Sequence, residues 1–512
     1  MSHTSSAPTK RELLVAIDQG TTGSAVAFYD FQTLGLIAHH KTEFPQIYPQ
    51  PGWVEHNPID IWSSTCTSLQ KAWEKTCAAV PGARLSQIQS VGITNQRETC
   101  LAWNKKTGET AGNALVWQDR RTADFCAQLK SDEGVRKQIF NKTGLVCDPY
   151  FSASKMRYLV QHSPQVRQWA QKEELALGTV DSFLVFKLSG HKSFFTEHTN
   201  ASRTMLYSLQ SGTYDPDLCK LFEVPEHSLA PLLDSAAHFG TTLGAGILLD
   251  GIPITGILGD QQAALFGQNC VHAGEAKITF GTGAFLLMNT GTSPVFSDDG
   301  LLTTVALSAS GQRTFALEGA AFIAGAAVQF LRDNWNFVET TQQIEQLVQK
   351  DSRDENVVFV PSLAGLSAPF WNAHAKGVLF GLSRGTSKSQ VTRAVLESIA
   401  LQNAQLLQLM EKASGQPIVN VGVDGGAAQN NSLMQFQADI LRVKLTRPHN
   451  IETTSQGAAR VARLGLDATL EILPLETEKT FVPQMPHTQS HRLLAQWLRA
   501  ADAVNAFYSN DI

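Results

Sequence analysis

The sequence predicts an α/β fold of two large domains, and three observations support this prediction. The chain has 512 residues, which is more than one hydrophobic core usually serves. Short apolar runs that end in Gly, Asp or Thr alternate with longer stretches of helical periodicity, as is typical of α/β architecture. A strand followed by a Gly/Thr turn also occurs once in each half of the chain, which suggests a duplicated unit.

The N-terminal elements begin with an expected β-hairpin. Residues 13–17 are an apolar run that enters a tight turn, and residues 26–29 form the returning strand. Asn57 and Pro58 are suited to the N-cap and first position of a helix, and apolar residues follow at spacings of three and four. Further strands are expected at residues 91–94 and 252–258.

The C-terminal half repeats this order. Residues 276–279 lead into a second Gly/Thr turn, and residues 418–423 form another expected strand. Ser432 and Gln435 have the spacing of a capping box, which predicts a helix start at Ser432. The boundary is expected near residue 267, between the Asp260 loop and the second Gly/Thr turn, which gives domains at residues 11–267 and 268–512. No low-complexity linker marks it, so the domains are expected to pack closely.

The composition favours a globular enzyme. Hydrophobic residues make up 43% of the chain and charged residues 17%, and the formal charge is -5. Without a basic cluster, nucleic acid is not an expected partner. The seven cysteines are scattered singly, which argues against a disulfide framework or a structural zinc site. No apolar run reaches membrane-spanning length and the first ten residues lack an apolar signal core, so no membrane span and a cytoplasmic location are expected.

Both Gly/Thr turns could bind phosphate. Glycine lets the backbone approach a ligand closely, and threonine hydroxyls and backbone amides donate to phosphate oxygens. Asp18, at the end of the first strand, could hold Mg²⁺, which prefers hard oxygen ligands. One such turn alone is best interpreted as an ordinary hairpin. Two of them favour a nucleotide site for ATP, although neither a Walker motif nor GxGxxG occurs.

A polar cluster supplies a candidate base. Asp260 follows an expected strand, and α/β folds place reactive groups at strand ends. Its carboxylate could accept the proton of an alcohol that attacks the γ-phosphate, or it could simply cap the following helix. Arg97 and Glu98 could bond neighbouring hydroxyls, although adjacent opposite charges are usually solvated. Trp117 and Phe285 would be core residues by default.

Several strings of residues, spread in order from about residue 14 to about residue 465, resemble one known family. They include AIDQGTT, YPQPGWVEHNP, GITNQRET, TNASRTML, GDQQAALFGQ, FGTGAF and DGGAAQNNSLMQFQADIL. These strings are similar to those of the FGGY carbohydrate kinases. The resemblance implies two actin-like, ribonuclease-H-type domains with an ATP and substrate cleft between them. It also implies ATP- and Mg²⁺-dependent phosphorylation of glycerol to sn-glycerol 3-phosphate.

The resemblance further implies a role for individual residues. Asp260 would be the general base and Asp18 would organise Mg²⁺. The glycerol pocket would be lined by Arg97, Glu98, Trp117, Tyr150, Asp260, Gln261 and Phe285. The nucleotide ligands would be Thr21, Thr22, Gly23, Thr282, Gly325, Gln329, Gly426 and Asn430. By analogy, a homodimer or homotetramer is expected.

The sequence departs from the family pattern at three places. Asn372 replaces an acidic residue, with no predicted effect, and the other two departures have predicted consequences. Ala25 stands where an arginine usually reaches the ATP phosphates. Its absence predicts weaker use of ATP, because each hydrogen bond to a charged group contributes about 1.5–3 kcal/mol. Residues 246–251 lack the loop that binds a sugar bisphosphate in some bacterial members, so this inhibition is not expected.

Two alternatives stay open, and a third is treated as a chance match. Residues 381–385 match the GxSxG nucleophile elbow of α/β-hydrolases, but no other motif supplies an acid–histidine pair. A related kinase could act on a pentulose or another polyol. A non-catalytic actin-like binding protein is suggested only by Ala25.

Overall fold

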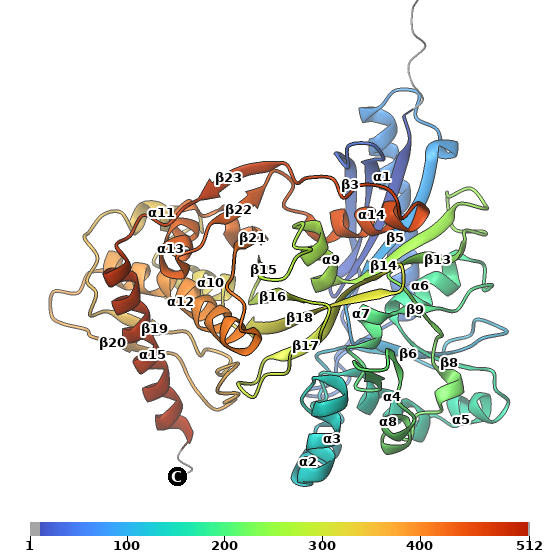
Figure 1. Ribbon diagram of the computed structural model, residues 1–512, viewed down its shortest axis with the longest axis horizontal. Helices are drawn as coiled ribbons and strands as arrows, with labels where there is room; N and C mark the ends of the chain where they lie inside the picture. The colour runs from blue at the N-terminus through green and yellow to red at the C-terminus, as the bar shows by residue number, and fades with distance from the viewer. Residues whose placement is uncertain (1–10, 510–512) are drawn as a thin grey trace, which may run out of the picture. The chain divides into compact units, whose positions relative to one another are not determined.

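The computed structural model describes residues 11–509, and they form two compact units (Figure 1). Unit 1 comprises the residues up to Gly267 together with Thr304–Thr314 and Thr453–Pro474, and unit 2 comprises the remainder. The α/β element order expected from the sequence is confirmed. The units differ from the expected domains in the two later segments, which cluster with unit 1 although they follow residue 268.

A six-stranded mixed sheet forms the centre of unit 1, in the order β13-β14-β5-β1-β2-β3. β1 is antiparallel to β2 and parallel to β5, and β5 is parallel to β14. The carboxyl ends of β1, β5 and β14 therefore meet at one edge of the sheet. The strands are β1 (Leu13–Gly20), β2 (Gly23–Asp30), β3 (Leu36–Glu43), β5 (Ile88–Asn95), β13 (Ala236–Thr241) and β14 (Pro253–Gly259).

Alternate residues of β1 belong to different cores, as the two-residue period of a strand requires. Val15 packs in a core that includes helices α1 (Pro58–Ala79) and α6 (Val180–Leu188). Ala16 packs in another core, which includes residues of α14 (Thr453–Leu466). The sheet of unit 1 is thus covered by helices on both faces.

Helix α14 lies directly on the sheet because glycines leave room for its backbone. A Cβ on Gly92 of β5 would meet the carbonyl oxygen of Ala458, and one on Gly256 of β14 would meet the backbone nitrogen of Ala462. Figure 1 shows the helix beside strands from the beginning of the chain. This close contact explains why a late segment of the sequence folds with unit 1.

A seven-stranded sheet has the order β17-β18-β16-β15-β21-β22-β23. Strands β16, β15, β21, β22 and β23 belong to unit 2, whereas Thr304–Thr314, which include most of β17 and the start of β18, cluster with unit 1. β15 is antiparallel to β16 and parallel to β21, which repeats the relation of β1 to β2 and β5. The duplication suggested by the two Gly/Thr turns is therefore present in the topology. The elements are β15 (Glu275–Phe280), β16 (Ala284–Gly291), β17 (Leu302–Ala309), β18 (Gln312–Ala321), β21 (Asn420–Asp424), β22 (Leu445–Pro448), β23 (Thr477–Phe481), α10 (Gly325–Asp333), α12 (Lys388–Ser414), α13 (Asn431–Leu441) and α15 (His487–Ser509).

One expected helix start is wrong. The N-cap of α13 is Asn430, whose Oδ1 accepts from the backbone N–H of Leu433 at 2.9 Å. Ser432 lies inside the first turn, and its backbone nitrogen and hydroxyl both donate to Glu345. The predicted cap of α1 by Asn57 is confirmed.

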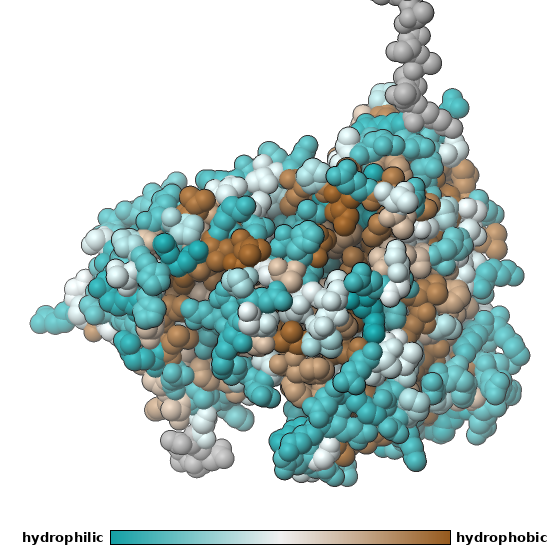
Figure 2. All heavy atoms as spheres, viewed as in Figure 1, coloured by the Kyte–Doolittle hydropathy of each residue, from teal (hydrophilic) through white to brown (hydrophobic). Residues whose placement is uncertain are grey.

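Hydrophilic and hydrophobic side chains are interspersed on the face drawn in Figure 2. The most exposed large hydrophobic side chains come from separate parts of the chain and include Tyr48, Ile59 and Phe507. Within residues 11–509, no helix has the length and apolar character needed to cross a bilayer.

Candidate active site

The parallel strands of unit 1 end in register. Asn95, the last residue of β5, lies opposite both Gln19 of β1 and Gly259 of β14. The residues that follow these strands therefore share one edge of the sheet. This edge brings Arg97 and Asp260 into contact, although 163 positions separate them in the sequence.

Arg97 joins two carboxylates at this edge. Its Nε lies 3.2 Å from Asp260 Oδ1 and 3.9 Å from Glu98 Oε1. Its Nη1 donates to Gln262 Oε1 at 3.3 Å. The Nε of Arg203 donates to Glu98 Oε1 at 2.5 Å. Two guanidinium groups thus balance two carboxylates, which is the condition under which buried charges are tolerated.

Exposure distinguishes Asp260 from the other three charged groups. The side chains of Arg97 and Glu98 are each 2% exposed and that of Arg203 is 0% exposed, whereas that of Asp260 is 30% exposed. The interpretation of Arg97 and Glu98 as a solvated pair is therefore wrong. Asp260 Oδ1 also accepts from the backbone N–H of Gln261 at 2.7 Å, at the start of α9 (Asp260–Gly267). An N-cap accepts from the second or third residue of its helix, so this bond from the adjacent residue does not make Asp260 a cap.

A tight reversal places both charged residues after β5 in this buried group. Glu98 has φ of +59°, a conformation that is uncommon for residues other than glycine. The backbone N–H of Thr99 donates to the carbonyl of Arg97 across it at 2.7 Å. Ser152 Oγ donates to the carbonyl of Glu98 at 3.0 Å. These bonds hold a strained backbone at the point where two consecutive charged side chains are buried.

Two aromatic side chains border the charged group. The rings of Trp117 and Tyr150 meet edge to face at 5.6 Å, and the guanidinium of Arg203 lies 5.4 Å from the Tyr150 ring. Trp117 Nε1 donates to Thr21 Oγ1 at 3.0 Å. Buried Lys155 donates to the carbonyls of Tyr150 and its two neighbours. Trp117 is half-buried, so its default assignment to the core is wrong.

A buried imidazole supports the first Gly/Thr turn. Gln46 Nε2 donates to the carbonyl of Thr21 at 3.0 Å, and Gln46 Oε1 lies 2.8 Å from His56 Nε2. Gln96 Nε2 lies 3.3 Å from His56 Nδ1. Because Gln46 presents an acceptor and Gln96 a donor, His56 is neutral with its proton on Nε2. In agreement, burial lowers the pKa of His56 to about 4.

The residues at the first turn fit a magnesium ion that binds with phosphate. Asp18 is half-buried near the end of β1, beside Thr21 and Thr22. Among residues 11–509 there is no group of three or more His, Cys, Asp or Glu side chains that could hold a metal ion. A single carboxylate suits Mg²⁺, which keeps several waters and takes further oxygens from substrate phosphates.

In unit 2, the second Gly/Thr turn lies against the start of α10. The backbone nitrogens of Gly325 and Ala326 donate to the carbonyls of Gly281 and Thr282, each at 3.0 Å. A Cβ on Gly325 would lie 2.6 Å from the Gly281 oxygen, so only glycine fits this contact without a shift. Gln329 is exposed one turn further along the helix. The structure therefore groups three of the expected nucleotide ligands of unit 2.

The loop after β21 approaches the same turn. Gly425 has φ of +85°, and a Cβ on it would meet the carbonyl oxygen of Phe280. Gly426 follows and is exposed, and Asn430 caps α13.

Phe285 is half-buried in β16, which corrects its default assignment to the core. Its place in the polyol pocket stays a prediction.

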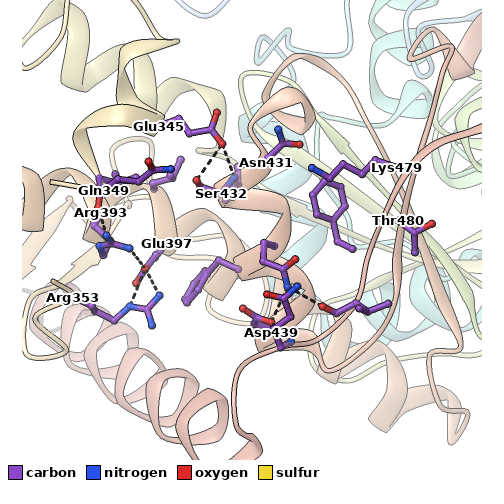
Figure 3. Close-up of a pocket in the computed structure, with 18 residues that line it drawn as sticks. Glu345, Gln349, Arg353, Arg393, Glu397, Asn431, Ser432, Asp439, Lys479 and Thr480 are labelled. Carbon is purple, nitrogen blue, oxygen red and sulfur yellow. Dashed lines mark hydrogen bonds and ion pairs between the residues drawn. The ribbon is translucent and has the colours of Figure 1, made fainter. Parts of the chain in front are cut away.

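Unit 2 also contains a cavity of about 580 Å³ (Figure 3). In this cavity Glu397 accepts from Arg353 at 2.6 Å and lies 3.8 Å from Arg393. Asp439 accepts from the backbone nitrogen of Gln484 at 2.6 Å. The described residues that line the cavity include none of the expected site residues. Because these carboxylates are already paired, we assign the cavity no part in the site.

The hydrolase alternative is disfavoured by the surroundings of Ser383. Its hydroxyl lies 3.2 Å from Thr386 Oγ1 in an exposed loop. A nucleophile elbow instead requires a sharp strand-to-helix turn and a histidine base. The partner observed here is another hydroxyl.

Three residues of the site were not predicted from the sequence. Arg203 and Gln262 lie inside strings shared with the family, TNASRTML and GDQQAALFGQ. Lys155 lies outside these strings. Arg203 and Lys155 are charged and fully buried, and a single sequence contains no signal of such burial.

The fold and the site define a class of protein. Residues 13–267 match the N-terminal domain of the FGGY family of carbohydrate kinases, and residues 276–466 match its C-terminal domain. The chain therefore belongs to the FGGY family of carbohydrate kinases.

Within this family the chain is similar to glycerol kinases. It is 46% identical over 496 residues to the glycerol kinase of Bdellovibrio bacteriovorus, which covers 96% of this chain and 99% of that protein. It is 44% identical over 502 residues to the glycerol kinase of Leptospira biflexa, covering 97% and 99% of the two chains. The crystal structure of Plasmodium falciparum glycerol kinase with ADP matches with a TM-score of 0.91 and 30% identity, covering 96% and 98%.

Proposed function

We propose that this chain transfers the γ-phosphoryl group of ATP to glycerol and yields sn-glycerol 3-phosphate. The observation that carries the proposal is the Asp260 carboxylate, 30% exposed beside the charge-balanced group of Arg97, Glu98 and Arg203. The two bacterial glycerol kinases, which are 46% and 44% identical over almost their full length, support glycerol as the substrate.

In this reaction Asp260 accepts the hydroxyl proton as the alcohol oxygen attacks the γ-phosphorus, and the bond to the departing ADP breaks. Mg²⁺, held through Asp18, would neutralise charge on the phosphates. The proposed polyol ligands are Arg97, Glu98 and Gln261, with Trp117, Tyr150 and Phe285 against the carbon chain. The proposed nucleotide ligands are Thr21, Thr22, Gly23, Thr282, Gly325, Gln329, Gly426 and Asn430.

A coupled assay of ADP release tests the proposal. Purified protein with Mg²⁺ and ATP is given glycerol, dihydroxyacetone, ribulose or no polyol. We expect the highest kcat/KM with glycerol. A preference for ribulose would support the pentulose kinase, and equal ADP release with and without every polyol would leave only a non-catalytic or ATP-hydrolysing protein.

The proposal includes a cytoplasmic location, where ATP is available, and a homodimer or homotetramer. Light scattering after size-exclusion chromatography tests the oligomeric state. A single peak with the mass of one chain would contradict it.

A further inference from the structure

The first Gly/Thr turn has a cation beside it that comes from a neighbouring strand. Ala25 of β2 lies directly opposite Asp18 of β1 on one side and Lys41 of β3 on the other. Directly opposite residues of antiparallel strands place their side chains on the same face. Asp18, Ala25 and Lys41 therefore form one row across the sheet, next to the turn.

The side chain of Lys41 leaves this row and runs beside Gly23, at the start of β2, to the turn. Its Nζ donates to Thr22 Oγ1 at 3.0 Å. Its Cε lies 3.1 Å from the position that a Cβ on Gly23 would occupy. Ala25 lies between Lys41 and Asp18 in the row, contributes only a methyl group and is half-buried. Lys41 and Thr22 are both exposed, so ligand oxygens can reach them.

We propose that Lys41 is the phosphate-binding cation of the first turn and contacts the triphosphate of the bound nucleotide. This inference rests on the proposed function, because it takes ATP as the ligand of the turn. An ammonium group has three donors. One of them reaches Thr22, and two remain for phosphate oxygens. The positive charge that is missing at Ala25 is thus supplied from the next strand.

The bond from Lys41 to Thr22 could alternatively serve only to stabilise the turn. The two roles differ in what charge removal does. A bond that only stabilises the turn raises the free energy of unfolding and therefore the Tm. A phosphate ligand instead raises the affinity for nucleotide, and another cation in the same row can replace it. Arginine at position 25 would provide such a cation.

The test compares Lys41→Met, Ala25→Arg and the double variant with the unaltered chain. Binding of a non-hydrolysable ATP analogue with Mg²⁺ is measured by titration calorimetry, together with KM for glycerol and the Tm. We expect Lys41→Met to raise the Kd of the analogue about 10- to 100-fold, the range for a lost bond to a charged group, with little change in KM for glycerol. Ala25→Arg should lower the Kd more in the Lys41→Met background than in the unaltered chain.

Lys75→Met is the matched control. Lys75 is exposed and donates to the carbonyl of His39, also in β3, but it lies outside the row of Lys41. We expect this variant to leave the Kd unchanged. An unchanged Kd in Lys41→Met, or a raised Kd that Ala25→Arg does not lower, would overturn the proposal.

The same measurements separate this inference from the proposed function. If the unaltered chain bound the analogue but released no ADP with glycerol, the substrate assignment would fail, while the role of Lys41 would still be decided by the variants. If the unaltered chain did not bind the analogue, both would fail.

Discussion

Arg97 and Asp260 form one ion pair, yet they occupy very different environments. The arginine is held in a buried group with Glu98 and Arg203, while the aspartate retains access to ligand. A buried charge that loses its partner is costly, so the arginine is suited to a fixed role. A partly exposed carboxylate such as Asp260 can exchange a proton with a bound alcohol. Asp260 is therefore the group suited to accept the proton, and its neighbours hold it in position.

Replacing Asp260 tests its proposed role as the base most directly. Asp260→Asn should lower kcat by about 10²–10⁴-fold, the usual contribution of a general base. The amide keeps the shape of the side chain, so glycerol binding measured by calorimetry should remain. Asp250→Asn, in an exposed loop of the same unit, is the control. A kcat above one tenth of the original would remove Asp260 from the role of base.

Substitutions at Asn430 can distinguish its role as a helix cap from its proposed role as a nucleotide ligand. Its side chain caps α13, and it is also a proposed nucleotide ligand. Serine is an equally good N-cap, whereas alanine costs about 1 kcal/mol. Asn430→Ser should therefore keep the Tm while raising KM for ATP, and Asn430→Ala should lower the Tm as well. Equal KM values for ATP in all three proteins would restrict Asn430 to capping.

Among the elements, helix α14 depends on two glycines for its position. Gly92 and Gly256 lie on neighbouring strands, β5 and β14, and each touches the helix backbone. β5 also leads into Arg97 and β14 into Asp260. The helix thus supports the two strands that position the charged group. A displacement of the helix would shift Arg97 and Asp260.

Overpacking this contact should destabilise unit 1. Gly92→Ala is expected to lower the free energy of unfolding by about 1–3 kcal/mol, the usual cost of extra volume in a packed core. Gly385→Ala is the control, because only Ser383 Oγ lies within 4 Å of an added Cβ. The measurement is urea denaturation followed by tryptophan fluorescence. Equal midpoints for both variants would show that the helix can shift freely.

For the whole molecule, buried ionisable groups make stability depend on pH. Burial lowers the pKa of both His56 and His198 from 6.5 to about 4. Between these values the unfolded chain binds more protons, so stability is lost as pH falls from 6.5 to 4. Glu197 acts in the opposite sense, because burial raises its pKa from 4.5 to about 7. The dependence of the free energy of unfolding on pH is therefore the sum of opposing contributions.

A comparison of the original chain with a His56 variant isolates the contribution of this imidazole to the pH dependence of stability. His56→Gln keeps a donor for Gln46 and an acceptor for Gln96 but cannot take up a proton. The original chain should lose roughly 3 kcal/mol more than the variant as pH falls from 6.5 to 4. Unfolding in urea at several pH values measures this difference. Parallel curves would mean that His56 titrates normally in the folded chain.

Local patterns were sufficient to predict the strands that end at the site. Leu13 to Ile17 and Ile252 to Leu258 are mainly apolar and are followed by polar residues. A parallel sheet places its ligands at these positions. The helix start at Ser432 was mispredicted because Asn430 offers a competing cap two residues earlier. A capping-box spacing alone does not decide between two good caps.

Local patterns in the chain are enough to predict the α/β class, the duplicated hairpin with its Gly/Thr turn, and Asp260 as a candidate base, because each depends on residues that are close together in sequence. Four features emerge only when the chain is folded: the burial of Arg97 and Glu98, their balance by Arg203, the place of α14 in unit 1, and the reach of Lys41 to Thr22. These features depend on strand register and on contacts between distant segments, and a one-dimensional pattern does not specify which distant segments meet.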